Sequence, residues 1–389
     1  MKVNIKKNIL FLIITTFMFI GNLMTNYTIN PNDIENKWIF TFGFSIVFFY
    51  FVLSNKVRLN REKILILMLW ELLIISLFFS KLLHENFQIF EFVLYSLVLP
   101  IVFFSNSIKL YKNLFLFSFV ISIIPFIYLL KPESIGMGNN NLGILFSIGG
   151  IVLLVLLNIK NVDNKFVYFS IILFTTLIYF TRSRTSLLAF LIIAILHYLI
   201  IFKSDNNSYL AVIRKLITIF VTLIVIYFSF DYIYNLFFSK WSSTGADITS
   251  GRGDFWITTI NNGLTMFGNG ENYFLIYNVR DAHNAFIQIL GDYGLISTFL
   301  FIILYIYIFV KSIRLKNLEY ISFFVGFFLL SQTENLFFLN SRLIGVHLLF
   351  FMYLGCIIND TRTKENEKYS VDKKILYRSD LNWKKGHRV

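Results

Sequence analysis

The sequence has very little cysteine and very little charge. It contains a single cysteine, Cys356, so no disulfide framework can form within the chain. Only 15% of the 389 residues are charged, whereas 57% are hydrophobic and 47 are phenylalanine. A soluble globular domain rarely has this composition. The shortage of charge therefore indicates a membrane protein.

Several familiar site patterns are also missing from the sequence. No group of His, Cys and carboxylate residues has the spacing of metal ligands, so neither a metal site nor a cofactor is predicted. The sequence has no glycine-rich loop of the nucleotide-binding type and no nucleophile elbow. The net charge of +13 could suggest a nucleic-acid partner, but the basic residues are spread over many short loops and a tail. That distribution fits membrane topology better than a nucleic-acid surface.

Apolar runs recur along almost the whole chain, and each can cross a hydrocarbon core of roughly 30 Å as a helix. We predict an all-α transmembrane bundle of about 12 spans over residues 1–358, followed by a basic cytoplasmic tail, 359–389, attracted to anionic lipid. The spans are expected near residues 8–25, 38–54, 64–80, 87–104, 114–130, 141–158, 166–180, 185–202, 214–230, 285–310, 318–333 and 343–358.

Two of these runs need comment. The first follows two lysines and lacks a small-residue cleavage site, so it is expected to be a retained span and not a signal peptide. The tenth contains Gly291, Asp292 and Gly294. We therefore expect a short interfacial helix over 285–290, with the true span after it.

The basic residues are divided unequally between the two sides of the predicted bundle. Of the 35 lysines and arginines, 26 fall on the side of the two termini and 9 on the other. Because loops rich in Lys and Arg stay in the cytoplasm, both termini are predicted to be cytoplasmic. One long loop, about 231–284, is then outside.

The stretch YFTRSRTSLLAF places Arg182 and Arg184 in a short outer turn between two spans. One interpretation is helix chemistry: arginines at a helix C-terminus interact favourably with its dipole, and Thr185 or Ser186 would cap the next helix. The other is anion binding. The predicted outer loops contain five arginines and four lysines, whereas the inner side contains seven arginines and nineteen lysines. Arginine is suited to phosphate because its planar guanidinium can form two parallel hydrogen bonds.

The long outer loop contributes further candidates. Arg252 lies between two glycines in GRGDFW, where the backbone can approach a ligand closely. Trp256 follows one helical turn later and is expected to anchor the loop at the membrane interface. Gly268 and Gly270, in GNG, are expected to form a flexible point.

His283 lies just before a span, next to Asn284 and close to Arg280 and Asp281. A histidine can act as a base near neutral pH, and a carboxylate can orient it. The alternative is an interfacial histidine that only caps the following helix.

Polar residues in or beside the spans form a last group. Ionisable residues within a membrane are functional candidates, and Glu71, Glu91 and Asp292 are expected to be of this kind. Glu334 lies at an outer helix end and could pair structurally with Arg342 across a short loop.

Four motifs, TRSRTS, GRGDFW, GNG and AHNAFIQILGDYGL, follow one another in this order on the outer side. Over about residues 136–300 the chain resembles the superfamily of O-antigen ligases and Wzy-type O-antigen polymerases. These have an Arg-Ser-Arg turn, then an outer loop with Gly-Arg, Trp and Gly-x-Gly, and then His-Asn leading into a span. The stretch GMGNNNLG, in which Asn139, Asn140 and Asn141 would otherwise cap the sixth span, is also similar. The first 130 residues are similar only in hydropathy.

The resemblance implies a metal-independent glycosyltransferase of the GT-C type in the bacterial inner membrane, with its active site on the outer face. Its substrate would be an oligosaccharide linked to undecaprenyl diphosphate. Arg182, Arg184 and Arg252 match the positions expected to hold the diphosphate, with Arg252 also counted as catalytic. His283 matches the position that handles the proton of the acceptor hydroxyl. The other residues expected to bind the substrate are Arg280, Asn284, Asn141, Glu334 and Arg342.

Three functions remain open at this level. The first is a repeat-unit polymerase of O-antigen or capsule, which transfers a glycan to a lipid-linked repeat, alone or with a chain-length regulator. The second is an O-antigen ligase, whose acceptor is lipid A-core. The third is a flippase for lipid-linked sugar, which would place charges near the bilayer midplane and often has an internal repeat. The outer grouping of charge and the lack of a clear repeat favour the glycosyltransferases.

Overall fold

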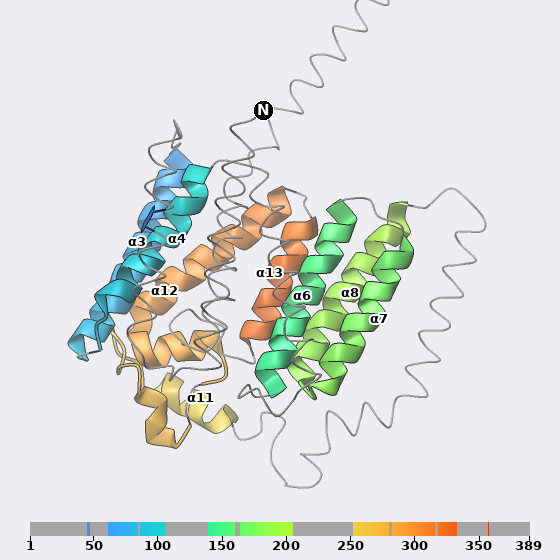
Figure 1. The fold of residues 1–389 in the computed structure, drawn as a ribbon. Helices are drawn as coiled ribbons and strands as arrows, with labels where there is room; N and C mark the ends of the chain where they lie inside the picture. Colours follow the sequence, from blue (N-terminus) through green and yellow to red (C-terminus); the bar gives the residue numbers. More distant parts are fainter. Residues whose placement is uncertain are drawn as a thin grey trace, which may run out of the picture.

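The computed structural model describes residues 45–46, 61–84, 86–105, 139–159, 164–204, 252–279, 282–315, 318–332 and 357. Every regular element within these ranges is a helix, as predicted (Figure 1). The helices are α3 (Arg61–Leu83), α4 (Ile89–Ser105), α6 (Asn139–Ile159), α7 (Asn164–Phe180), α8 (Arg184–Ser204), α11 (Arg252–Asn262), the 3₁₀ helix η2 (Tyr273–Tyr277), α12 (Ala285–Arg314) and α13 (Leu318–Ser331).

Seven of the predicted spans coincide with helices of the structure, namely α3, α4, α6, α7, α8, α12 and α13. Two of these, α3 with 23 residues and α12 with 30, are long and apolar enough to cross a membrane. The remaining predicted spans fall outside the described residues, apart from isolated positions. The total of about 12 spans stays a prediction.

The helices form two groups that meet at α12 and α13 (Figure 1). In one group α3 packs against α4 and α12, and Trp70 of α3 donates a hydrogen bond from Nε1 to the carbonyl oxygen of Tyr95 at 3.0 Å. In the other, α6 packs against α7, α8 and α13. Aromatic contacts such as that between Phe286 and Phe328 join α12 to α13. Burial of these apolar faces positions the loops described below.

The α7–α8 turn, α11, η2 and the start of α12 all lie at one end of the bundle, which we call the loop end (Figure 1). The described parts of the segments predicted to be outside are therefore together in space. At the opposite end, Lys311 of α12 forms an ion pair with Glu62 of α3 at 2.8 Å.

Helix α12 is broken near its start, as predicted. Gly294 has φ 82° and ψ −175°, which is not a helical conformation. In Figure 1 the first part of α12 lies across the loop end, and the second part runs obliquely up the bundle. A break of this kind leaves N–H and C=O groups without intrahelical partners.

The segment 265–270 supplies partners on one side of this break. The carbonyl oxygen of Thr265 accepts a hydrogen bond from the N–H of Leu295 at 3.0 Å. The carbonyl oxygen of Met266 accepts one from the N–H of Ile296 at 3.3 Å. The second part of α12 is therefore capped by loop backbone.

The same segment supplies partners on the other side. The N–H groups of Asn269 and Gly270 donate to the carbonyl oxygens of Gly291 at 2.9 Å and Asp292 at 3.1 Å. The side-chain nitrogen of Asn269 also donates to Gly291, at 3.0 Å. The loop thus bonds to both halves of the helix across one break.

Gly268 lies at the centre of this contact, in a left-handed conformation with φ 84°. A Cβ on Gly268 would lie 2.1 Å from the carbonyl oxygen of Asp292. Only glycine therefore allows the loop to approach α12 so closely. The prediction that GNG is a flexible point is wrong, because this stretch is tightly packed against backbone.

Candidate functional site

The TRSRTS turn begins where α7 ends at Phe180. Arg182 is exposed and has φ 55°, and its N–H donates to the carbonyl oxygen of Tyr179 at 2.9 Å. Thr181 is buried, and its hydroxyl donates to the carbonyl oxygen of Ile178 at 2.6 Å. Arg182 therefore projects from a turn that is held by its neighbours, at the C-terminal end of a helix.

Arg184 lies in a different electrostatic position, because it is the first residue of α8. A helix N-terminus favours negative charge, so the dipole explanation suits Arg182 but not Arg184. The expected capping residues were also wrong: Thr185 and Ser186 lie inside α8, and Ser183 precedes it. The positive charge of Arg184 and the N-terminus of α8 would therefore attract the same anion.

The turn is packed against the start of α6. Ser183 is buried and its hydroxyl donates to that of Ser186 at 2.8 Å. A Cβ on Gly143 would lie only 2.3 Å from the Cβ of Ser183. Because α6 begins at Asn139, Asn141 lies in its first turn and not at the cap position. The GMGNNNLG and TRSRTS motifs therefore converge.

Arg252 is the first residue of α11, a short amphipathic helix. Its buried residues, Phe255 and Thr259, face a small apolar cluster with Phe274. Trp256, one turn after Arg252 and so on the same side of the helix, donates from Nε1 to the carbonyl oxygen of Ala282 at 2.7 Å. In the structure Trp256 thus ties the Arg252 helix to the residue before His283.

His283 has a left-handed backbone with φ 49°. The cap of α12 is its neighbour Asn284, whose side-chain oxygen accepts hydrogen bonds from the N–H groups of Phe286 at 2.9 Å and Ile287 at 3.1 Å. The Asn284 side-chain nitrogen donates to the carbonyl oxygen of Gln332 at 3.1 Å. Capping is therefore the role of Asn284, and the capping interpretation of His283 is wrong.

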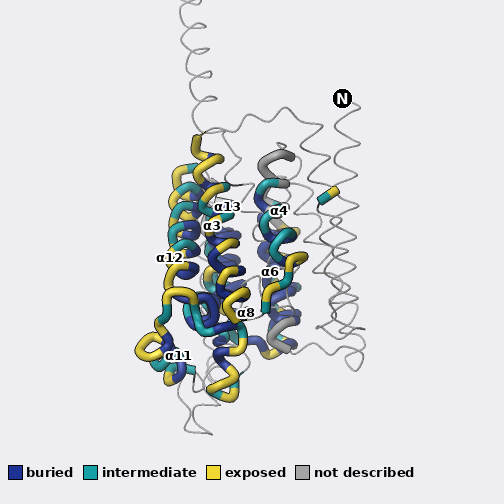
Figure 2. Tube along the Cα trace, turned by 90° about the vertical axis from the view of Figure 1, so that its left-hand side faces the viewer, coloured by how far each residue is buried: buried dark blue, intermediate teal, exposed yellow. Residues whose placement is uncertain are grey.

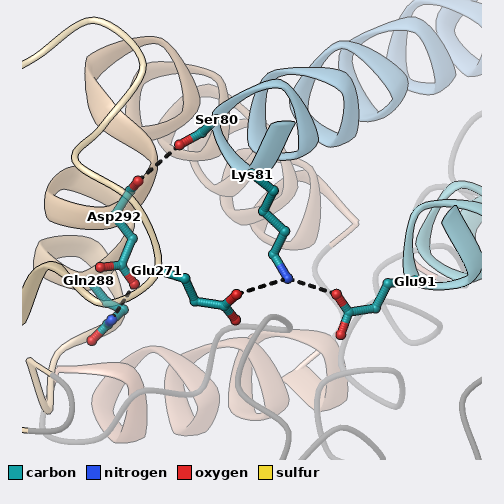
Figure 3. Close-up of polar contacts among 6 residues, drawn as sticks. All are labelled: Ser80, Lys81, Glu91, Glu271, Gln288 and Asp292. Atoms are coloured by element: carbon teal, nitrogen blue, oxygen red, sulfur yellow. Dashed lines mark hydrogen bonds and ion pairs between the residues drawn. The ribbon is translucent and has the colours of Figure 1, made fainter. Parts of the chain in front are cut away.

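A chain of hydrogen bonds links this region to the helix break. The N–H of Ala282 donates to the side-chain oxygen of Gln288 at 2.6 Å. The side-chain nitrogen of Gln288 donates in turn to the carboxylate of Asp292, and Ser80 of α3 donates to the carbonyl oxygen of Asp292 at 3.0 Å (Figure 3). The buried Asp292, which the sequence indicated as a functional candidate, is thus connected through Gln288 to the residue before His283.

Lys81 and Glu271 were not predicted as site residues, but they belong to a charged cluster at the loop end (Figure 3). Lys81 and Glu91 are buried, with their nitrogen and oxygen 2.7 Å apart, and Glu271 lies 3.4 Å from the same nitrogen. The sequence signal was limited to Glu91, an acidic residue in a predicted span. Lys81 and Glu271 are 190 positions apart in the sequence, so their pairing could not be predicted.

A tyrosine pair completes the small cluster beneath α11. The hydroxyls of Tyr273 and Tyr277 are 2.9 Å apart. This hydrogen bond, followed by burial, raises the pKa of Tyr277 to about 12. Tyr277 therefore stays protonated at neutral pH.

The structure thus groups the predicted residues in two sets at the loop end: Arg252, His283 and Asn284 around α11 and the start of α12, and Arg182 and Arg184 beside α6. Helix α13 connects them, because it packs against both α8 and α12. Three predicted residues, Arg280, Glu334 and Arg342, lie outside the described residues. Within the described ranges no group of three or more His, Cys, Asp or Glu is placed to hold a metal ion.

The arrangement is that of a helical membrane protein with polar loops gathered at one end of the bundle. Residues 169–302 match the family model described as O-antigen ligase. The matched range contains α7, the arginine turn, α8, α11, η2 and the break in α12. Comparison with curated proteins and with solved structures gave no match.

The predicted resemblance is therefore confirmed over this segment: residues 169–302 are similar to the O-antigen ligase and Wzy-type superfamily. Members are glycosyltransferase-like enzymes of bacterial membranes. The match includes all four motifs on which the resemblance rested, whereas GMGNNNLG precedes it.

Proposed function

We propose that the protein is a polysaccharide repeat-unit polymerase that takes its glycan from an undecaprenyl-diphosphate carrier. The observation that carries the proposal is Arg184 at the N-terminus of α8, where the helix and the side chain both favour an anion. The neighbouring Arg182 projects from the same turn. A lipid diphosphate presents its charge at the membrane–water boundary, where such a turn would lie.

In the proposed reaction the oxygen of an acceptor sugar hydroxyl attacks the anomeric carbon of the donor glycan. The bond between this carbon and the diphosphate oxygen breaks, and the diphosphate leaves with the electron pair. Arg182, Arg184 and Arg252 offset the negative charge that develops on it, which is a large catalytic contribution in reactions of this type. His283 accepts the hydroxyl proton as the new glycosidic bond forms.

Contacts in the structure support these roles by fixing the backbone around the proposed base. The Trp256–Ala282 hydrogen bond holds the chain on one side of His283, and the Asn284–Gln332 hydrogen bond holds it on the other. Reacting groups must be placed within a fraction of an ångström for efficient transfer. We infer that these bonds position His283 relative to Arg252.

The second candidate is an O-antigen ligase, and the description of the matching family model favours it. Both enzymes would use the same donor and the same arginines. They differ in the acceptor, which is a lipid-linked repeat for the polymerase and lipid A-core for the ligase.

The glycan of a deletion strain separates the two. Loss of a polymerase leaves single repeats attached to the surface lipid, whereas loss of a ligase leaves none attached. Complementation with the wild-type chain should restore long polymer. If the deletion left the glycan unchanged, both candidates would be wrong.

A further inference from the structure

The stretch LTMF, residues 264–267, is apolar and exposed although it lies outside the helices. Leu264, Met266 and Phe267 are exposed by 46%, 62% and 38%. Figure 2 shows exposed segments of the chain next to α11 at the loop end. Adjacent exposed apolar side chains of this kind mark a contact surface.

The stretch continues an exposed apolar stripe on α3. The ring of Phe267 packs edge-on against that of Phe79, with centroids 4.9 Å apart. Phe79 is one of several exposed apolar residues on α3 at spacings of three or four, which places them on one side of the helix. These residues are Leu65, Met68, Leu72, Ile75, Phe79 and Leu82.

On a helix long and apolar enough to cross a membrane, such a stripe is the side expected to face lipid. Since Phe267 extends it without a gap, the 264–267 stretch is continuous with the lipid-facing surface. The seven residues from Leu264 to Gly270 carry no charge. The first acidic residue after them, Glu271, is paired with Lys81.

Non-helical backbone enters the apolar part of a bilayer only when its polar groups have partners. Two carbonyl groups of the stretch meet this requirement, because Thr265 and Met266 use their carbonyl oxygens to accept hydrogen bonds from α12. The N–H groups of Asn269 and Gly270 donate to α12 as well. The side-chain nitrogen of Asn269 is bonded to Gly263 and Gly291.

From the exposed side chains, their continuity with α3 and the hydrogen bonds that the Thr265 and Met266 carbonyls accept from α12, we propose that residues 264–267 form a membrane wedge. Its side chains contact the acyl chains of the leaflet at the loop end. The wedge fixes the depth at which α11 and the start of α12 sit relative to the bilayer. This inference concerns the membrane and does not depend on the proposed glycosyl transfer.

The single cysteine makes the test direct. In a Cys356→Ser background, a nitroxide is attached at Met266→Cys, and the full chain is placed in lipid nanodiscs. Power-saturation EPR then compares collisions with oxygen, which concentrates in acyl chains, and with a water-soluble nickel chelate. Leu72→Cys on the α3 stripe is the lipid control, and Asn262→Cys, exposed at the end of α11, is the water control.

A label at Met266→Cys should favour oxygen as strongly as the label at Leu72→Cys, and the Asn262→Cys label should favour the chelate. Leu264→Cys provides the same measurement if Met266→Cys does not fold. The wedge is wrong if the labels at 264 and 266 resemble the water control. It is equally wrong if neither reagent reaches them, because protein would then cover the stretch.

Discussion

Gly268 and Gly294 meet at the break in α12, where a Cβ on Gly294 would lie 2.2 Å from the backbone nitrogen of Gly268. One glycine belongs to the segment that follows α11 and the other to the long helix α12. Their contact allows four backbone hydrogen bonds between segment and helix. The Gly-x-Gly and GDYG motifs therefore form the two sides of one close backbone contact.

Gly294→Ala should destabilise the protein. At φ 82° and ψ −175° a side chain adds strain of about 1–3 kcal/mol, and the steric clash with Gly268 adds to it. Thermal unfolding in detergent should show a clear drop in the midpoint. Gly326→Ala is the control, since the one short contact of its Cβ would be with the flexible end of Ile151. Equal unfolding midpoints for the two variants would contradict a stabilising role for the Gly268–Gly294 contact.

Lys81→Met should be much more harmful than Glu271→Gln. The first change leaves the buried Glu91 without its cation, and breaking a buried ion pair costs about 3–5 kcal/mol. The second affects a carboxylate that is 35% exposed, where about 0–1 kcal/mol is typical. Unfolding midpoints measure both. The double variant Lys81→Met, Glu91→Gln should recover part of the loss, and the absence of any recovery would argue against the pairing.

Trp256→Phe should mainly slow glycan transfer and have only a small effect on the free energy of unfolding. It removes the hydrogen bond to Ala282, and small displacements near a reacting group cost about tenfold to hundredfold in rate. Trp70→Phe loses a similar bond, to Tyr95, but within the α3–α4 pair. It should lower the unfolding midpoint without slowing transfer by a folded enzyme. Similar transfer rates for the two variants would remove the positioning role of Trp256.

His283→Asn should stop transfer while donor binding persists. Asparagine tolerates the left-handed backbone of this position, so the change removes the base without adding strain. Loss of a general base lowers rates by roughly 10²–10⁴-fold. Binding of lipid diphosphate and transfer by the purified protein are measured side by side. Transfer at the wild-type rate would mean that His283 is not the base.

Within the described residues, hydropathy predicted the long helices well because membrane spans must be long and apolar. The windows 166–180 and 185–202 match α7 and α8 within a few residues, and the glycines of α12 correctly indicated its break. Helix ends were less accurate. Arg182 and Arg184 were treated as one feature, although Arg182 follows the C-terminus of α7 and Arg184 is at the N-terminus of α8.

Contacts between distant segments could not be predicted in the same way. The bonds of the GNG segment to α12 are made by backbone groups, which have no residue-specific signal. Lys81 looked like an ordinary loop lysine until folding placed Glu271 beside it. The family motifs supplied the candidate residues, but only the fold shows that the GNG segment is bonded to α12 and that Arg182 is exposed in a turn held by its neighbours.

The most direct test of the central claim replaces Arg182, Arg184 and Arg252 by alanine one at a time in the complemented deletion strain. Each variant should reach the membrane but make no polymer. Lysine at the same positions should restore little polymer, because it lacks the planar guanidinium that binds a diphosphate through two parallel hydrogen bonds. Arg61→Ala, an exposed arginine at the opposite end of the bundle, should leave polymer unchanged. Normal polymer lengths from all three alanine variants would contradict diphosphate binding at the loop end.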